Sequence, residues 1–182
     1  VLTVMGPSGV GKSTLLQAIA GQLQAPFSIA GKIKINGVVI NDMDAHLRKV
    51  GIMFQDALLF EHMTVGENIA FAMPADRQKN KQMKRDAINE LLAAVDLDGI
   101  ADRAVSTLSG GQQARVSLIR TLASQPEVVL LDEPFSKLDV ALRGQIRSWT
   151  FSQLKARKIP AVLVTHDKDD ALAAGGDIIE LL

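Results

Sequence analysis

The sequence contains no cysteine and no tyrosine, and it has only one tryptophan in 182 residues. The absence of cysteine excludes disulfide bonds and thiolate metal sites, and it agrees with a cytosolic location. Neither sign of charge is in excess, because 20 basic residues balance 20 acidic ones. Such a balance provides no excess of positive charge to attract nucleic acid or an anionic membrane, so we expect no nucleic-acid partner.

Long apolar runs are also missing. None approaches the roughly 18 residues that a membrane-spanning helix needs, so we expect a soluble protein. The length fits a single domain, residues 1–182, large enough to bury roughly 70% of its unfolded surface. The chain opens on Val1 rather than Met and already lies in an apolar run, which suggests that an N-terminal piece is missing.

A glycine-rich stretch lies between this first apolar run and a helical pattern. It reads Gly6, Pro7, Ser8, Gly9, Val10, Gly11, Lys12, Ser13, Thr14. The glycines let the backbone turn tightly and point successive N–H groups inward, so the loop and the helix N-terminus form an anion cradle. Lys12 adds a charge at the β- and γ-phosphates of a nucleotide, and Ser13 offers a hydroxyl to Mg²⁺. A chance match in a chain of this length is roughly one in 150.

Strand and helix patterns alternate along much of the chain. Strands are predicted at residues 1–5, 50–54, 128–131, 161–165 and 177–182. Helices are predicted after the glycine loop, with Leu15, Leu16, Ile19 and Leu23 on one side, and over residues 87–95, 109–123, 142–154 and 167–174. This alternation favours an α/β fold with a mostly parallel sheet. The dipeptide Asn36-Gly37 predicts a hairpin over residues 31–40.

The middle of the chain contains no strand pattern. Residues 56–74 are rich in Leu, Phe and Met but have little periodicity, and residues 77–85 form a polar, basic run that we interpret as a solvated loop and helix start. We therefore expect a helical insertion that stands off the sheet. The predicted division is a core of residues 1–55 and 125–182, and a helical subdomain of residues 56–124.

Four polar side chains directly follow predicted strands: Gln55, Asp132, Glu133 and His166. Open α/β sheets bind ligands at the carboxyl ends of their strands. Asp132 is expected to hold Mg²⁺ with Ser13, and Glu133 to orient or deprotonate the water that attacks the γ-phosphate. His166 is placed to reach the γ-phosphate. Gln55 is expected to contact Mg²⁺ or the attacking water, although alone it would be an ordinary polar cap.

A second candidate anion site precedes the helix at residues 109–123. It consists of Ser109, Gly110, Gly111 and Gln112, which follow Leu108. Two phosphate sites for one nucleotide imply that the second is supplied by another subunit. The other interpretation is an ordinary helix start capped by Ser109, and the stretch fits that pattern as well.

With these pieces in this order, the chain resembles the ATP-binding subunit of an ATP-binding cassette (ABC) transporter over nearly its whole length. The matching motifs are Walker A at residues 6–14, the Q-loop at Gln55, the signature at residues 108–112, Walker B at residues 128–132 with Glu133, the D-loop at residues 136–139 and the H-loop at His166. The resemblance implies a P-loop NTPase core of the RecA-like type and an ATPase that uses ATP and Mg²⁺. It also implies catalytic roles for Lys12, Gln55, Glu133 and His166.

The family resemblance also implies partners. In that family two ATPase subunits close head to tail, with each ATP between the Walker A of one and the signature of the other, and hydrolysis drives membrane-spanning permease subunits. We therefore expect a second ATPase subunit, identical or paralogous, permease partners, and a location on the cytoplasmic face of the cell membrane. Residues 58–68 look like the importer-type segment that grips a permease helix, with Phe60, Met63 and Phe71 as contacts. The family's adenine-stacking aromatic lies before Walker A, outside this chain.

Two alternatives remain open at this stage. A guanylate kinase has a similar phosphate loop and length, but it has no use for residues 108–112, for Asp132-Glu133 or for His166, and it would be expected to carry tyrosines. A non-transport ABC ATPase acting in DNA repair or on ribosomes is the other. Repair members carry long coiled-coil insertions between the Q-loop and the signature, and ribosome-associated members usually hold two cassettes. The transported substrate cannot be read from this chain.

Overall fold

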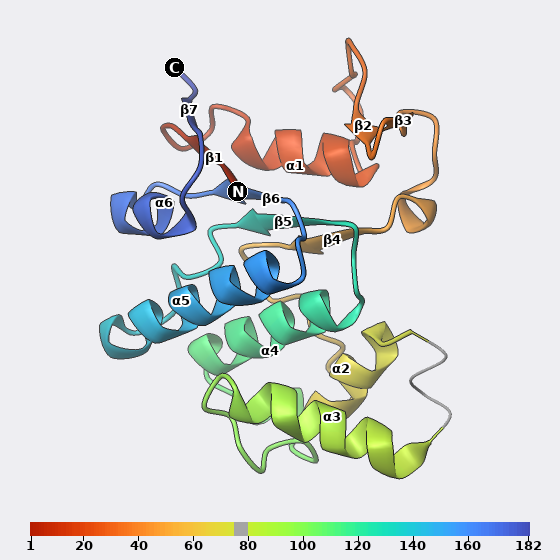
Figure 1. Ribbon diagram of the computed structural model, residues 1–182, viewed down its shortest axis with the longest axis vertical. Coiled ribbons are helices and arrows are strands. Elements are labelled where there is room, and N and C mark those ends of the chain that lie inside the picture. Colours follow the sequence, from red (N-terminus) through yellow and green to blue (C-terminus); the bar gives the residue numbers. More distant parts are fainter. Residues whose placement is uncertain (75–79) are drawn as a thin grey trace.

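The computed structural model describes residues 1–74 and 80–182, and its centre is a parallel sheet of five strands. The strand order is β4-β5-β6-β1-β7, and all four pairings between neighbours are parallel. Figure 1 shows the sheet between two helical layers. Its strands are β1 (Leu2–Met5), β4 (Val50–Met53), β5 (Val128–Asp132), β6 (Ala161–Val164) and β7 (Ile178–Glu180).

The central strand β5 is buried on both faces. Leu130 packs in a cluster with Leu16 of helix α1 (Lys12–Ala20), whereas Leu131 packs in the cluster of the opposite face. Because successive side chains of a strand point to opposite faces, a strand covered on both sides needs apolar residues at every position. The run Val-Val-Leu-Leu meets that requirement, and the predicted strand at residues 128–131 is confirmed.

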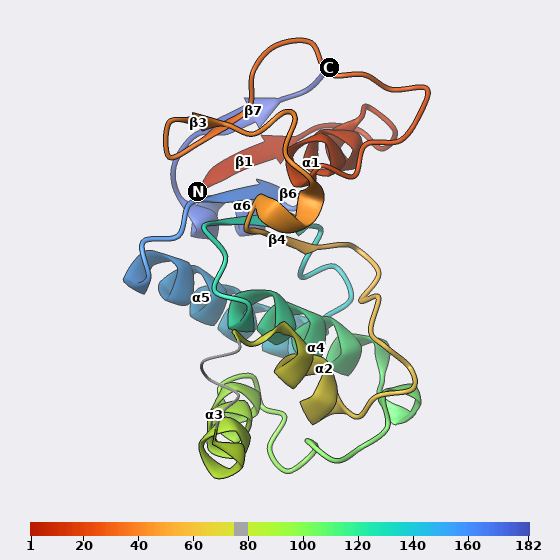
Figure 2. The ribbon, with the colours of Figure 1, turned by 90° about the vertical axis from the view of Figure 1, so that its right-hand side faces the viewer.

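Helices cover both faces of the sheet, and two more lie beyond them. Helix α1 covers one face, and α4 (Gly110–Ala123) and α5 (Val140–Ala156) cover the other (Figures 1 and 2). Helices α2 (Val65–Ala72) and α3 (Lys81–Ala93) lie at the end of the molecule opposite the C-terminus. The remaining elements are α6 (Lys168–Ala174), the short helices η1 (Ala45–Leu47) and η3 (Val105–Thr107), and strands β2 (Lys34–Ile35) and β3 (Val38–Val39).

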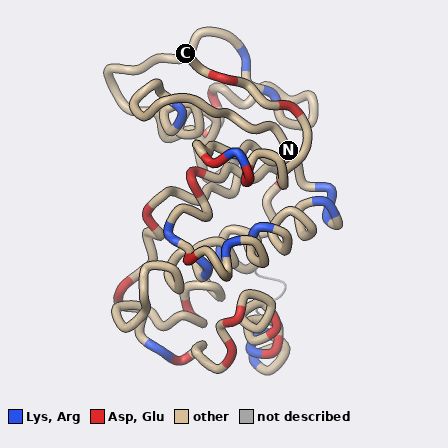
Figure 3. Tube along the Cα trace, turned by 90° about the vertical axis from the view of Figure 1, so that its left-hand side faces the viewer, with Lys and Arg blue, Asp and Glu red and all other residues tan. Residues whose placement is uncertain are grey.

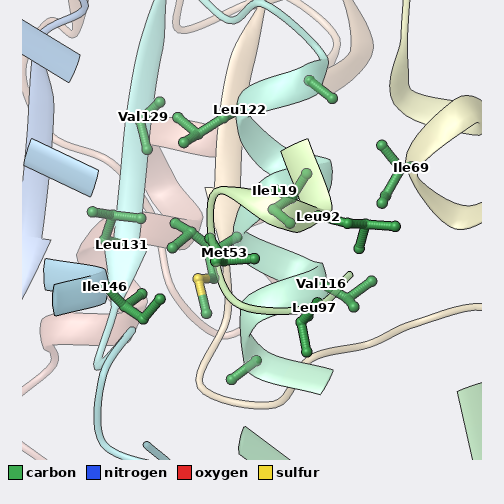
Figure 4. Packing of buried hydrophobic residues seen from close by; sticks show 14 of the residues in the cluster. Met53, Ile69, Leu92, Leu97, Val116, Ile119, Leu122, Val129, Leu131 and Ile146 are labelled. Atoms are coloured by element: carbon green, nitrogen blue, oxygen red, sulfur yellow. The ribbon is translucent and has the colours of Figure 1, made fainter. Parts of the chain in front are cut away.

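One large apolar cluster joins the outer helices to the sheet (Figure 4). It runs from Ile69 of α2 and Leu92 of α3, through Ile119 of α4, to Met53 and Leu131 of the sheet, and each of these residues is at most 2% exposed. Helix α4 is the link, because it contacts both α2 and strand β4. The core is therefore continuous from the sheet into the helices that separate β4 from β5.

The predicted hairpin is confirmed as a two-stranded antiparallel pair, β2 with β3. Its turn residues Asn36 and Gly37 have φ angles of 49° and 82°. Left-handed backbone at both central positions is what a tight hairpin turn requires, and asparagine and glycine adopt it at little cost. The strands and helices predicted for residues 110–182 are also confirmed, within one to three residues at their ends.

Three expectations from the sequence need correction. Helix α2 was not predicted within residues 56–74, although Thr64 and Glu67 form a reciprocal capping box at its start. Helix α1 ends at Ala20, so Leu23 lies beyond it, and Leu15 is 40% exposed rather than on the buried side. The helix predicted at residues 87–95 is α3, which begins earlier, at Lys81, and ends at Ala93, while residues 77–79 of the basic run lie outside the described part of the chain.

Charged residues of both signs are spread along the chain. Basic and acidic residues are interspersed along the trace in Figure 3. Within residues 1–74 and 80–182, no helix combines the length and the apolar character needed to cross a bilayer.

The continuous core makes a testable prediction for α3. Leu92 is fully buried, whereas Met83 on the same helix is 68% exposed. We expect Leu92→Ala to lower the free energy of unfolding by about 2–5 kcal/mol, because it removes core contacts and leaves a cavity. Met83→Ala should change it by less than about 0.5 kcal/mol. Urea unfolding followed by circular dichroism measures both, and equal losses would contradict a core that extends into α3.

Candidate active site

A cavity of about 330 Å³ lies at the carboxyl ends of the central strands and gathers most of the predicted site. Its lining residues are Ser8, Gly9, Gly11, Lys12, Ser13, Thr14, Gln55, Asp132, Glu133 and His166. They come from the ends of β1, β4, β5 and β6, so the parallel sheet brings distant parts of the sequence to one edge. A larger hollow of about 690 Å³ near Lys155 contains none of the predicted residues.

The conformation of the phosphate loop depends on glycines with left-handed backbone angles. Gly9 and Gly11 have φ angles of 83° and 102°, which side-chain-bearing residues rarely adopt. The Lys12 ammonium donates to the carbonyl oxygens of Gly6 and Pro7, both at 2.8 Å, so the lysine folds back over its own loop. Among the described residues no side chain caps the N-terminus of α1. The amides of its first turn are therefore left for an anion.

Asp132 and Glu133 continue directly from β5. Asp132 is only 6% exposed, and among the described residues no basic side chain forms an ion pair with it. A carboxylate that lines a cavity without a basic partner is suited to a cation. Ser13 and Gln55 line the same cavity and offer a hydroxyl and an amide oxygen. These three oxygen donors are of the kind that Mg²⁺ prefers, and they fit the predicted metal set.

Glu133 has a strained backbone conformation at this position. Its φ is 49°, an uncommon value for a residue other than glycine. The conformation is fixed by hydrogen bonds on both sides of the residue: its N–H donates to the Val164 carbonyl at 2.9 Å, and its own carbonyl accepts the Ser136 hydroxyl at 2.8 Å. The Glu133 side chain is 13% exposed. Strain of this kind is stored where a side chain must be aimed, here into the cavity that Glu133 lines.

The His166 ring lies against Glu133. Its Nδ1 is 2.8 Å from the Glu133 Oε1, while the ring itself is 73% exposed. The backbone of His166 is fixed by the residues on either side of it, Thr165 and Asp167. The buried Thr165 hydroxyl accepts a hydrogen bond from the Asp167 N–H and donates one to the carboxylate of Asp170. An exposed ring on a fixed backbone can reach a ligand in the cavity without losing its carboxylate partner.

The signature residues lie elsewhere. Ser109 and Gln112 form a reciprocal capping box at the start of α4, with Gln112 N to Ser109 Oγ at 3.3 Å and Ser109 N to Gln112 Oε1 at 3.0 Å. Residues 109–112 do not line the cavity. Within one chain, therefore, they are not brought to the phosphate loop.

Several polar residues near the site were not predicted from the sequence. Arg143 and Arg147 of α5 form ion pairs with Asp167 and Asp170, at 3.2 and 2.9 Å. No local spacing pattern connects residues more than 20 positions apart, so only the fold reveals these pairs. The Asp167 cap of α6 is the exception, because an acid directly before a helix is a recognisable N-cap.

The aromatic residues expected to meet a permease lie on the surface. Phe60 is 36% exposed and Phe71 is 64% exposed, and their rings meet edge to face at 5.0 Å between centroids. The Arg120 guanidinium lies 5.6 Å from the centre of the Phe60 ring. It also donates to the carbonyl oxygens of Ala57 and Leu58, which holds this segment beside α4. Met63 is half-buried.

Residues 1–136 match the model of the family described as ABC transporter. The chain belongs to this family. It is therefore an ATP-binding cassette with the P-loop NTPase fold, and it is an ATPase of the ABC type, as its motifs predict. The family decides against the guanylate-kinase alternative.

Curated relatives of the cassette include transporter subunits. The chain is 47% identical to "Uncharacterized ABC transporter ATP-binding protein YnjD" of Escherichia coli (strain K12), over 95% of this chain and 79% of that protein. It is 41% identical to "Sulfate/thiosulfate import ATP-binding protein CysA" of Synechocystis sp., over 98% of this chain and 49% of that protein. The cassette thus spans about half the length of the import relatives it matches.

Solved structures agree with the fold of the cassette. The dimeric structure of the ATP-binding cassette MJ0796 in a post-hydrolysis state, bound to ADP and Pi, superposes with a TM-score of 0.85 at 30% identity. The match covers 99% of this chain and 80% of that one. A second dimeric MJ0796 structure gives a TM-score of 0.82 at 31% identity.

The contacts of Asp167 predict a pH dependence of stability. Burial alone would raise the pKa of its carboxyl, but amide hydrogen bonds at the start of α6 and the nearby Arg143 and Arg147 lower the pKa below its ordinary value. The ionised carboxylate therefore stabilises the folded state above its unfolded pKa, near 4, and this stabilisation is lost as the pH falls through the folded value. We expect Asp167→Asn to cost about 1 kcal/mol at pH 7 and progressively less below about pH 4.

The matched control for this prediction is Asp98→Asn, since Asp98 is exposed and shows no such contacts with residues 1–74 or 80–182. Urea unfolding at pH 7, 5 and 3 measures both variants. A loss for Asp167→Asn that stayed constant over this range would contradict a role for its charge.

Proposed function

We propose that the chain is the ATP-hydrolysing subunit of a membrane importer and that it works as one of two cassettes bound to separate permease subunits. The observation that carries this proposal is the single cavity that gathers the phosphate loop, Gln55, Asp132, Glu133 and His166. Those residues are the ones that one chain can supply for binding a nucleoside triphosphate and activating a water beside it.

In this proposal residues 6–14 bind the phosphates of ATP. The loop amides and the N-terminus of α1 receive the phosphate oxygens, and Lys12 leaves its loop carbonyls to contact the β- and γ-phosphates. Ser13, Gln55 and Asp132 would hold Mg²⁺, which would supply positive charge against the phosphates. The feature that favours this assignment is the position of Asp132, which lines the cavity and forms no ion pair with a basic side chain of the described residues.

Glu133 is the proposed general base. Its carboxylate accepts a proton from the attacking water, or orients that water toward the γ-phosphate. His166 donates its Nδ1–H to the Glu133 carboxylate and keeps that carboxylate in place, while the rest of its exposed ring contacts the γ-phosphate. A positioned base contributes typically 10²- to 10⁴-fold to a rate, so loss of Glu133 should be severe.

The signature residues are proposed to act in trans. Ser109, Gly110, Gly111 and Gln112 do not reach the cavity of their own chain, although they stand at the N-terminus of a 14-residue helix that favours anions. A second cassette docked head to tail would present them to the γ-phosphate. The dimeric MJ0796 structures make such pairing of cassettes a reasonable expectation for this chain.

Permease binding is assigned to the exposed aromatic surface of Phe60, Phe71 and the half-buried Met63. Exposed aromatic residues grouped beside the half-buried Arg120 are typical of a protein interface. The import relatives favour import over export and a transport role over repair or ribosome work, and they favour a place on the cytoplasmic face of the membrane. We further propose that residues 56–124 act as a subdomain that passes motion between this surface and the core of residues 1–55 and 125–182.

Glu133→Gln tests the proposed chemistry, because glutamine keeps the size of the side chain and removes the base. We expect ATP affinity within about threefold of the parent and a hydrolysis rate at least about 100-fold lower. Hydrolysis is followed by phosphate release, and ATP affinity by equilibrium dialysis. Glu127→Gln is the matched control, since Glu127 lies at the opposite end of β5 and pairs with Lys49. Parental turnover by Glu133→Gln would overturn the assignment.

A further inference from the structure

Arg143, in the first turns of α5, joins two loops of the site. Its Nη1 lies 3.2 Å from the Asp167 carboxylate, directly after His166. Its Nη2 donates to the carbonyl oxygens of Leu138 and Ser136, at 3.1 and 3.4 Å. One guanidinium therefore contacts both the segment that carries His166 and the loop at residues 136–138.

These contacts close a ring around Glu133. The Ser136 hydroxyl donates to the Glu133 carbonyl, Arg143 reaches from the Ser136 carbonyl to Asp167, and His166 returns to the Glu133 carboxylate at 2.8 Å. Every link is a hydrogen bond or ion pair except the covalent step from Asp167 to His166. Arg143 thus connects residues 136–138 with the segment that carries His166.

Arg143 makes these contacts while one of its own donors stays unsatisfied by the described residues. Its side chain is 29% exposed, yet its Nε is buried and finds no hydrogen-bond partner in the described part of the chain. An unsatisfied buried donor carries a cost and calls for an explanation. Arg147, which is on the same helix as Arg143, offers a contrast: it pairs with Asp170 of α6, and within the described residues none of its hydrogen bonds reaches residues 136–138.

We infer that Arg143 is a positioning residue for hydrolysis, which holds residues 136–138 and the His166–Asp167 segment in one arrangement around Glu133. This rests on the proposed function of Glu133 and His166. The planar fork of arginine suits the task because it can bond a carboxylate and two carbonyls at once, whereas the compact ammonium of lysine cannot span them. Removing Arg143 should therefore slow the chemical step and leave ATP binding intact.

The test is steady-state ATP hydrolysis by Arg143→Met and Arg143→Lys. We expect kcat to fall about tenfold in Arg143→Met and about threefold in Arg143→Lys, with KM for ATP within about twofold of the parent. Arg157→Met is the matched control, since Arg157 ends the same helix and bonds the Leu122 carbonyl and the Gln153 side chain far from the cavity. Its kcat should stay within about twofold of the parent.

A double variant separates positioning from general loss of structure. If Arg143 acts through Asp167, then Arg143→Met with Asp167→Asn should have the same kcat as Arg143→Met alone, since the link is already broken. The inference would be overturned if the two substitutions lowered kcat independently, so that the loss in the double variant equalled the product of the two single losses. A parental kcat in Arg143→Met would overturn it as well. If Arg143→Met does not fold, a parental kcat in Arg143→Lys overturns it. Failure of the proposed function is distinguishable, because Glu133→Gln would then turn over ATP like the parent.

Discussion

The arrangement of the site depends on the pairing of β5 with β4 and β6. Leu131 pairs with Met53, and Asp132 pairs with Val164. Because the strands are parallel and in this register, each ends at the same edge, and the residues that follow them become neighbours. Burial of β5 on both faces keeps that register, since a slip of one residue would exchange its apolar side chains between two different clusters. The chemistry at the edge thus follows from packing in the interior.

Stability and function compete at that edge. Asp132 is a buried acid that no basic side chain of the described residues neutralises, Glu133 has a left-handed backbone, and Arg143 has a buried donor that none of those residues satisfies. The backbone conformation of Glu133 and the buried donor of Arg143 each oppose folding; Glu133 lines the cavity, and Arg143 pairs with Asp167, next to His166. The large apolar cluster offsets these costs, because it extends from the sheet through α4 into α2 and α3. Such departures from low-energy geometry concentrate at working sites.

Much of this architecture could be predicted from the sequence. The run at residues 128–131, the Asn36-Gly37 turn and the glycine loop each have one dominant physical interpretation, and the structure agrees with them. Helix α2 was missed because its apolar residues lack clear periodicity, and Leu15 was misplaced because only the fold decides which side of α1 is covered. The contacts of Arg143 join distant positions, which no local pattern can show. Residues 109–112 were predicted as an anion site, and a single chain leaves that prediction open.

The central claim is that a second copy completes the nucleotide site. Sedimentation velocity of Glu133→Gln, with and without ATP and Mg²⁺, tests it most directly, because bound ATP then persists without hydrolysis. We expect a monomer without nucleotide and a dimer with ATP, and no dimer when Ser109→Glu is added, since a carboxylate would repel the phosphates across the interface. A monomer that binds ATP at saturation, or a dimer unaffected by Ser109→Glu, would contradict the claim.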